Sequence, residues 1–152
     1  MHSLVVVTLV GAGLITGLLF AFSNFVLAAL TRLPDRHAMF AMQRINEQII
    51  NPIFLLMFLG TPLACVATII TSGSAGPARA PLVIGALLYL VGPLGITVLR
   101  NVPLNDRLAR THLDDSTTAW PDYVKRWQFW NHLRSYIGIA SMFFLGFGAV
   151  AL

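Results

Sequence analysis

Long apolar stretches alternate with short polar connections along the chain. Each stretch lacks charged side chains and is close to the ~20 residues that a helix needs to cross a bilayer. They cover residues 4–29, 52–71, 81–99 and 135–152. Because backbone polar groups in lipid must be satisfied within the segment itself, such runs favour helices over barrel strands. The pattern predicts an all-α fold, a four-helix transmembrane bundle that forms a single domain over residues 1–152.

Two polar connections have helical patterns of their own, so we expect amphipathic helices beside the membrane. The first is expected over residues 34–50, with a proline at its first position. Asn51-Pro52 then either caps and starts the second span or kinks a continuous helix. Residues 118–134 predict a second amphipathic helix, which runs directly into the fourth span.

Composition agrees with an integral membrane protein. Hydrophobic residues make up 57% of the chain, charged residues only 11%, and the mean hydropathy is +0.76, whereas soluble domains have about 25% charged residues. The net charge is +4, but no basic tail or basic–aromatic patch is long enough to bind nucleic acid. The single cysteine excludes an intrachain disulfide. Zinc, phosphate-loop and nucleophile-elbow motifs are absent from the sequence.

The ten Lys and Arg residues are divided unevenly between the two sides of the predicted membrane. Only Arg79 lies between the second and third spans, and the others lie in the first and third connections together with all six acidic residues. By the positive-inside rule these connections and their amphipathic helices are cytoplasmic, and both termini are outside. We expect an integral protein of a bacterial inner membrane.

Polar side chains gather on the predicted cytoplasmic side of the first half of the chain. Asn24, near the end of the first span, needs a partner because an amide is costly in lipid. That partner is either a ligand or another helix. In the following helix, one face carries Phe40, Arg44, Glu47 and Asn51. This face is either solvated or directs polar groups into a wet cavity.

The helix before the fourth span has the densest set of candidate groups. One stripe of the helix carries Trp127, Trp130, Asn131 and Arg134, and His132 lies roughly 100° from Asn131. The stripe is either a membrane-boundary belt with a snorkelling arginine or a pocket wall of aromatic and polar groups. His132 is either a structural hydrogen-bonding group or a general base.

The sequence LRNVPLNDRL, residues 99–108, follows the third span and is unusually polar. Pro103 disfavours a helical conformation in the preceding residue and predicts an extended step at Val102. This step would free Asn101 and Asn105 from helical spacing, so that both point back toward the bundle. The alternative is a helix stop whose amides cap neighbouring backbone groups.

Three motifs in this order, MQRINEQIINPIF, VLRNVPLNDRL and WQFWNHLR, resemble the anthrone oxygenase-like family of small four-helix membrane proteins. The resemblance covers nearly the whole chain, and the combination is more specific than any one motif. It implies an oxygenase that uses dioxygen on reduced polycyclic aromatics, as fungal members do on anthrones. It also implies that neither a metal ion nor an organic cofactor takes part.

The resemblance further implies a site that contains a base, donors for an oxyanion and a flat apolar slot. His132 would be the base that removes the acidic methylene proton of an anthrone, and two tryptophans would stack on its rings. The catalytic residues would be His132, Asn101, Asn105 and Arg134. The substrate-binding residues would be Trp127, Trp130 and Asn131, and we add Asn24, Arg44 and Asn51 because they lie on the same predicted side of the membrane.

Two other interpretations stay open. In the first, the chain is a non-catalytic membrane protein that binds a quinone or a lipid, or a scaffold for a partner subunit. In the second, His132 holds a heme or a metal ion, although the sequence offers no second nearby ligand. The expected partners are the lipid bilayer and a small aromatic or quinone-like ligand, not nucleic acid, and a homo-oligomer is compatible with the sequence.

Overall fold

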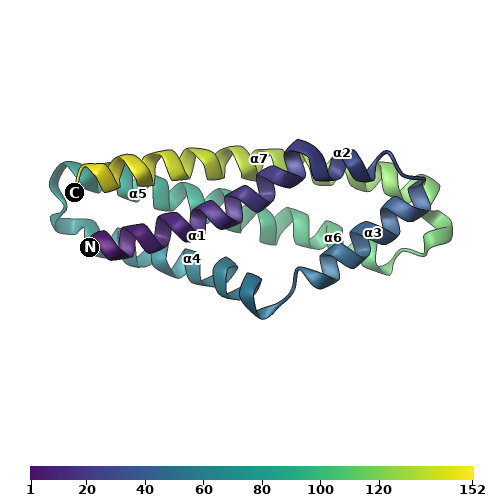
Figure 1. Ribbon diagram of the computed structural model, residues 1–152, viewed down its shortest axis with the longest axis horizontal. Helices are drawn as coiled ribbons and strands as arrows, with labels where there is room; N and C mark the ends of the chain where they lie inside the picture. The colour runs from purple at the N-terminus through teal and green to yellow at the C-terminus, as the bar shows by residue number, and fades with distance from the viewer.

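The computed structural model describes residues 1–152, which form helices and no strands. Long helices run along the longest axis of the molecule (Figure 1). The α-helices are α1 (His2–Ala21), α2 (Leu27–Leu30), α3 (Asp35–Gln48), α4 (Pro52–Thr71), α5 (Arg79–Tyr89), α6 (Val102–Arg110) and α7 (Ser116–Val150). The π-helical segments Phe22–Val26 and Leu90–Asn101 join α1 to α2 and α5 to α6. Short 3-10 turns cover Ser72–Ser74, Gly76–Ala78 and Leu113–Asp115.

Four continuous helices are long and apolar enough to cross a membrane, which confirms the predicted all-α bundle with four spans. They cover His2–Leu30, Pro52–Ser74, Gly76–Arg110 and Leu113–Val150. The third and fourth extend far beyond the predicted apolar stretches. They do so because each helix continues into amphipathic sequence, which hydropathy alone does not mark as part of a span.

The two ends of the bundle carry different elements. Both termini lie at one end, which we call the terminal end, and α3 and α6 lie toward the opposite end, which we call the polar end (Figure 1). The polar end thus brings together the two connections that are rich in charged residues. Its assignment to the cytoplasm remains a prediction.

At the terminal end, α5 packs closely against α7. Ala86, Tyr89 and Leu145 are completely buried there. Ser141 Oγ donates a hydrogen bond to the carbonyl of Gly85 at 2.7 Å, and a Cβ added at Gly85 would collide with the backbone of α7. Small residues of this kind allow two membrane helices to approach each other closely.

At the polar end, a second core holds α3 against α6 and α7. Met39, Met42, Leu108 and Trp120 are buried in it. Gln43 Nε2 crosses the same interface and donates to the carbonyl of Leu108 at 2.8 Å. The amphipathic helix α3 therefore covers the polar end of the bundle.

The break between α3 and α4 is a helix cap. Asn51 is extended (φ −124°, ψ 162°), and its Oδ1 accepts a hydrogen bond from the N–H of Phe54 at 3.0 Å. Pro52 occupies the first helical position, where its missing N–H is not needed. Of the two alternatives predicted for Asn51-Pro52, the cap is therefore the one that the structure adopts.

The predicted extended step at Val102 is wrong. Val102 is helical (φ −60°, ψ −49°), and its N–H bonds to the carbonyl of Thr97, five residues back, as in a π-helix. Pro103 lies in the first turn of α6, a position that tolerates proline. The helix therefore continues through the proline, and Asn101 and Asn105 reach the bundle from successive turns of one continuous helix.

Candidate functional site

A cavity of about 370 Å³ lies between α1, α3, α4, α6 and α7. Most of its wall is apolar and includes Leu19, Phe22, Phe54 and Phe58. The polar side chains on the wall are Gln43, Asn46, Glu47, Thr97, Asn105, Asp106 and Arg134. Mostly apolar walls with a few polar groups are typical of small-molecule sites, whose volumes are roughly 300–1,000 Å³.

Arg134 of α7 brings a buried guanidinium to this wall, since the residue is only 5% exposed. Its Nε and Nη2 donate to Asn131 Oδ1 at 3.0 and 2.7 Å, and its Nη1 donates to Thr97 Oγ1 at 2.7 Å. The guanidinium carbon lies 5.3 Å from the centre of the Trp127 ring, within the range of a cation–π contact. Neutral partners alone therefore hold this cation.

Asn131 connects Arg134 to the first helix. It is completely buried, and its Nδ2 donates to the carbonyl of Leu19 at 2.9 Å and to Ser23 Oγ at 2.8 Å. Ser23 belongs to the π-helical segment that follows α1, and π-turns inside helices occur frequently at functional sites. Asn131 therefore positions the guanidinium and has no free group of its own for a ligand.

Asn105 and Asn101 fix the ring that faces Arg134. Asn105 Oδ1 accepts hydrogen bonds from Tyr123 Oη at 2.9 Å and from Trp127 Nε1 at 2.8 Å. Asn101 Nδ2 donates to the carbonyl of Trp127 at 3.2 Å, and its Oδ1 is buried without a hydrogen-bond partner. Both asparagines therefore act on the position of the indole ring.

The structure thus brings together half of the residues predicted for the site. Asn105, Trp127 and Arg134 line the cavity, and Asn101 and Asn131 lie behind its wall and hydrogen-bond to the groups that line it. These residues come from the motifs VLRNVPLNDRL and WQFWNHLR, which lie at the junction of the π-helical segment with α6 and on α7.

The other predicted residues lie outside this network. Asn24 is exposed on the π-helical segment after α1. Arg44 forms an ion pair within α3, and Asn51 caps α4. Trp130 packs under the guanidinium of Arg100, which lies 4.9 Å from the ring centre.

His132 does not line the cavity. Its ring stacks on that of Tyr136, with 6.2 Å between the centroids and 23° between the planes. Its Nδ1 is buried without a hydrogen-bond partner. Successive side chains of a helix are rotated by about 100°, so His132, next to the buried Asn131, points toward a different face of α7.

Five polar residues of the wall were not among the predicted site residues: Gln43, Asn46, Glu47, Thr97 and Asp106. Glu47 shares a helical face with Arg44, but the pattern fits a solvated face equally well. Thr97 precedes Asn101 by one helical turn, and this spacing is a usable signal. Asp106 is exposed, and it reaches the cavity because α6 continues the third span without interruption.

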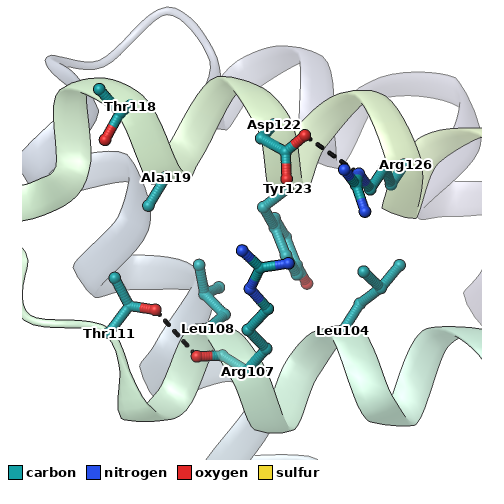
Figure 2. Close-up of a pocket in the computed structure, with 9 residues that line it drawn as sticks. All are labelled: Leu104, Arg107, Leu108, Thr111, Thr118, Ala119, Asp122, Tyr123 and Arg126. Carbon is teal, nitrogen blue, oxygen red and sulfur yellow. Dashed lines mark hydrogen bonds and ion pairs between the residues drawn. The ribbon is translucent and has the colours of Figure 1, made fainter.

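A second cavity, of about 420 Å³, lies between α6 and the first turns of α7 (Figure 2). Arg107 and the exposed ion pair of Arg126 with Asp122, at 3.0 Å, are on its wall. Tyr123 also lines it, and its hydroxyl reaches Asn105 on the first cavity. No group of three or more His, Cys, Asp or Glu side chains in residues 1–152 is placed to hold a metal ion.

Fold and cavity together define a small four-span membrane protein with a ligand-sized cavity at the polar end of its bundle. The family model of the anthrone oxygenases matches residues 39–144. The chain therefore belongs to the anthrone oxygenase family, which confirms the resemblance found in its motifs. Comparisons with curated proteins and with solved structures give no match. The matched residues include most of α3, all of α6 and most of α7. They contain the Arg134 network apart from the hydrogen bonds that Asn131 makes to Leu19 and Ser23.

Proposed function

We propose that the protein is a membrane-embedded oxygenase of anthrone-like, phenolic polycyclic substrates, and that the cavity beside Arg134 is its active site. Membership of the family supports the class of reaction. The observation that carries the site is the buried guanidinium over Trp127, on the wall of a mostly apolar cavity of about 370 Å³. A flat aromatic ligand with a polar oxygen is complementary to such a wall.

The proposed reaction needs no electron donor or acceptor besides its two substrates. Oxidation of the anthrone methylene carbon to a carbonyl releases four electrons, and one dioxygen molecule accepts four. One oxygen atom becomes the new carbonyl oxygen, and the other leaves as water with the two methylene hydrogens. The protein has to supply a base, a site for the intermediate oxyanion and a cavity that excludes other reactants.

In the first step a base removes a methylene proton, and the electron pair moves to the ketone oxygen, which becomes an oxyanion. Arg134 donates hydrogen bonds to this oxygen. We assign the proton removal to Asp106, because Glu47 on the same wall is held in an ion pair by Arg44. The anion then reacts with dioxygen at the ring carbon, and the resulting hydroperoxide loses water. His132, the base implied by the resemblance, has no contact with the cavity.

Turnover by the purified protein in lipid nanodiscs tests the proposal. Incubated with anthrone and dioxygen, the protein should form anthraquinone faster than empty nanodiscs do, with one dioxygen consumed for each anthraquinone formed. A rate equal to that of empty nanodiscs would contradict the proposed function.

A pair of variants tests the assignment of the base. Asp106→Asn should lower kcat by about 10²–10⁴-fold, the usual contribution of a positioned base, while His132→Gln should leave kcat nearly unchanged. The reverse result would transfer the role to His132. Size-exclusion profiles of both variants would show that kcat is compared between folded proteins.

One observation favours a second function, the binding of a quinone or a lipid without catalysis. Ile50 and Leu55 line the cavity and are also 68% and 38% exposed, so apolar side chains connect the cavity to the apolar surface of the bundle. A long-chain amphiphile would fit this arrangement. Co-purification of a quinone or lipid, detected by mass spectrometry and combined with no anthrone turnover, would favour this alternative.

A further inference from the structure

The buried charge of Arg134 on the cavity wall has no opposite charge within ion-pair distance. The ion pairs of the protein join Arg36 to Asp114, Arg44 to Glu47 and Arg126 to Asp122. Arg134 belongs to none of them, although it is only 5% exposed. A buried charge without a counter-ion is costly, and an ionisable residue inside a membrane protein is by default a functional residue whose partner has to be identified.

Two carboxylates line the same cavity, and neither neutralises this charge. Glu47 is 2.6 Å from Arg44 and half exposed. Asp106 is exposed on α6, and it lies farther than 4.0 Å from the guanidinium nitrogens of Arg134. Water and salt screen exposed carboxylates much more than buried groups. The buried end of the cavity wall therefore keeps a positive charge.

The guanidinium also has unused donors. An arginine carries five N–H groups, and Arg134 uses three of them, two toward Asn131 and one toward Thr97. Asn131 Oδ1 is a neutral acceptor whose own Nδ2 is tied to the first helix. The surroundings thus fix the orientation of the cation and leave both its charge and two donors available to a ligand.

We propose that the cavity holds its ligand as an anion, an aromatic molecule whose ionised oxygen, a phenolate, an enolate or a carboxylate, is the counter-ion of Arg134. The aromatic class of the ligand rests on the proposed function, and the requirement for negative charge rests on the unpaired guanidinium. Asn131 is the positioning residue, because it orients the fork of Arg134 without neutralising it. The cavity should therefore select ligands by charge as well as by shape.

Two probes of nearly equal shape test this selection. Anthracene-9-carboxylate is an anion and anthracene-9-carboxamide is neutral, and neither has the methylene group that the oxygenase reaction needs. Their dissociation constants can be measured with the full chain in nanodiscs by quenching of tryptophan emission, after subtraction of empty nanodiscs. We expect the carboxylate to bind at least about tenfold more tightly than the amide, as for a hydrogen bond between charged groups. Equal affinities would overturn the proposal.

Two variants ask whether the preference comes from Arg134. Arg134→Gln should bind both probes equally, and the exposed control Arg126→Gln, which changes the net charge by the same amount, should keep the wild-type ratio. A preference that survives in Arg134→Gln overturns the proposal. A preference lost in Arg126→Gln also overturns it, since the ratio would then reflect the overall charge of the protein.

Asn131→Asp provides a second route, which decides the question if Arg134→Gln does not fold. The new carboxylate has almost the same shape as the amide and supplies a permanent counter-ion to the guanidinium. It cannot donate the hydrogen bonds that Nδ2 makes to the carbonyl of Leu19 and to Ser23 Oγ, so size-exclusion chromatography has to show that the variant is folded. The preference for the anionic probe should disappear while Arg134 is still present, and its persistence would contradict the role of the free charge. Because these measurements need no turnover, a charge preference without anthraquinone formation would refute the proposed function alone.

Discussion

The two halves of the bundle hold their helices together in different ways, although α7 runs through both. In the terminal half, Gly85 and Ser141 let α5 and α7 approach until their backbones are nearly in contact. In the polar half, the same helix presents Trp127, Asn131 and Arg134, and hydrogen bonds to side chains and carbonyls replace close backbone contact.

This difference shows how one helix can support both a tightly packed region and a cavity. Small residues close the space between helices. Large polar residues can hold helices apart without a penalty if each buried group finds a partner. The packed terminal half then acts as the fixed support of the polar half, where the cavity lies. Changes in the two halves should therefore affect different measurable properties.

The largest expected effect is on the chemistry of the polar half. Arg134→Gln should lower the kcat of anthrone oxidation by about 10²–10³-fold, because it removes a donor and a charge from the oxyanion. The rate has to be expressed per folded protein, with the folded fraction taken from size-exclusion chromatography. Arg126→Gln is the matched control, and a loss of equal size in that variant would contradict the assignment.

In the terminal half we expect an effect on stability. Gly85→Ala should lower the free energy of unfolding by about 1–3 kcal/mol, as overpacking does, because its Cβ would meet the backbone of α7. Gly146→Ala is the control, since a Cβ there meets no atom within 4 Å and alanine favours a helix by up to ~1 kcal/mol. Denaturation in detergent micelles measures the free energy of unfolding of both variants. Equal effects of the two variants would show that the close contact is unimportant.

A smaller effect is expected at the junction of α3 and α4. Asn51→Ala should cost about 1 kcal/mol of stability through the loss of the helix cap, and Asn51→Asp should retain most of it because aspartate also caps helices. Thermal unfolding compares the two variants. If Asn51→Ala instead weakened the binding of anthracene-9-carboxylate at unchanged stability, Asn51 would be a binding residue, as the sequence analysis predicts.

The smallest effect is expected for the exposed pair beside the second cavity. A double-mutant cycle on Asp122 and Arg126 should give a coupling of about 0.3–0.5 kcal/mol, which is usual for exposed pairs one helical turn apart. The coupling should vanish near 1 M salt, because the Debye length is then only ~3 Å. A larger coupling that salt does not reduce would indicate that the pair is less solvated than its exposure implies.

The spans could be predicted because charge-free stretches of about 20 residues leave few alternatives in a membrane. The second span illustrates this, since the predicted stretch and α4 both cover residues 52–71. Hydropathy alone does not give the full lengths of the third and fourth helices. The amphipathic pattern of residues 118–134 predicted the extension of the fourth, and these residues are helical in α7. The third was predicted to be interrupted at Val102 because of Pro103, whereas the helix continues through the proline into α6.

The candidate site was predictable only in part. Helical periodicity places Trp127, Asn131 and Arg134 on one stripe, and the structure brings them together. Periodicity does not tell which stripe faces a cavity, so Thr97 was not predicted although it lies one helical turn before Asn101. The chemistry of a side chain is also a poor guide to its direction, as His132 illustrates. Its neighbour Asn131 points into the network, whereas the imidazole stacks on Tyr136.

The π-helical segment Leu90–Asn101 makes the site tolerant to a change in the number of residues at one place in the chain. A π-turn contains one residue more than an α-turn. Deleting Gly95 would remove this extra residue and allow one π-turn to return to the α-helical pattern, so that Asn101 and Asn105 would still face α7. A deletion within α7 has no extra residue to remove and would rotate everything beyond it by about 100°. When relatives are aligned with this chain, a gap of a single residue in the π-helical segment is therefore compatible with the same cavity, whereas a gap between Trp127 and Arg134 marks a differently built one.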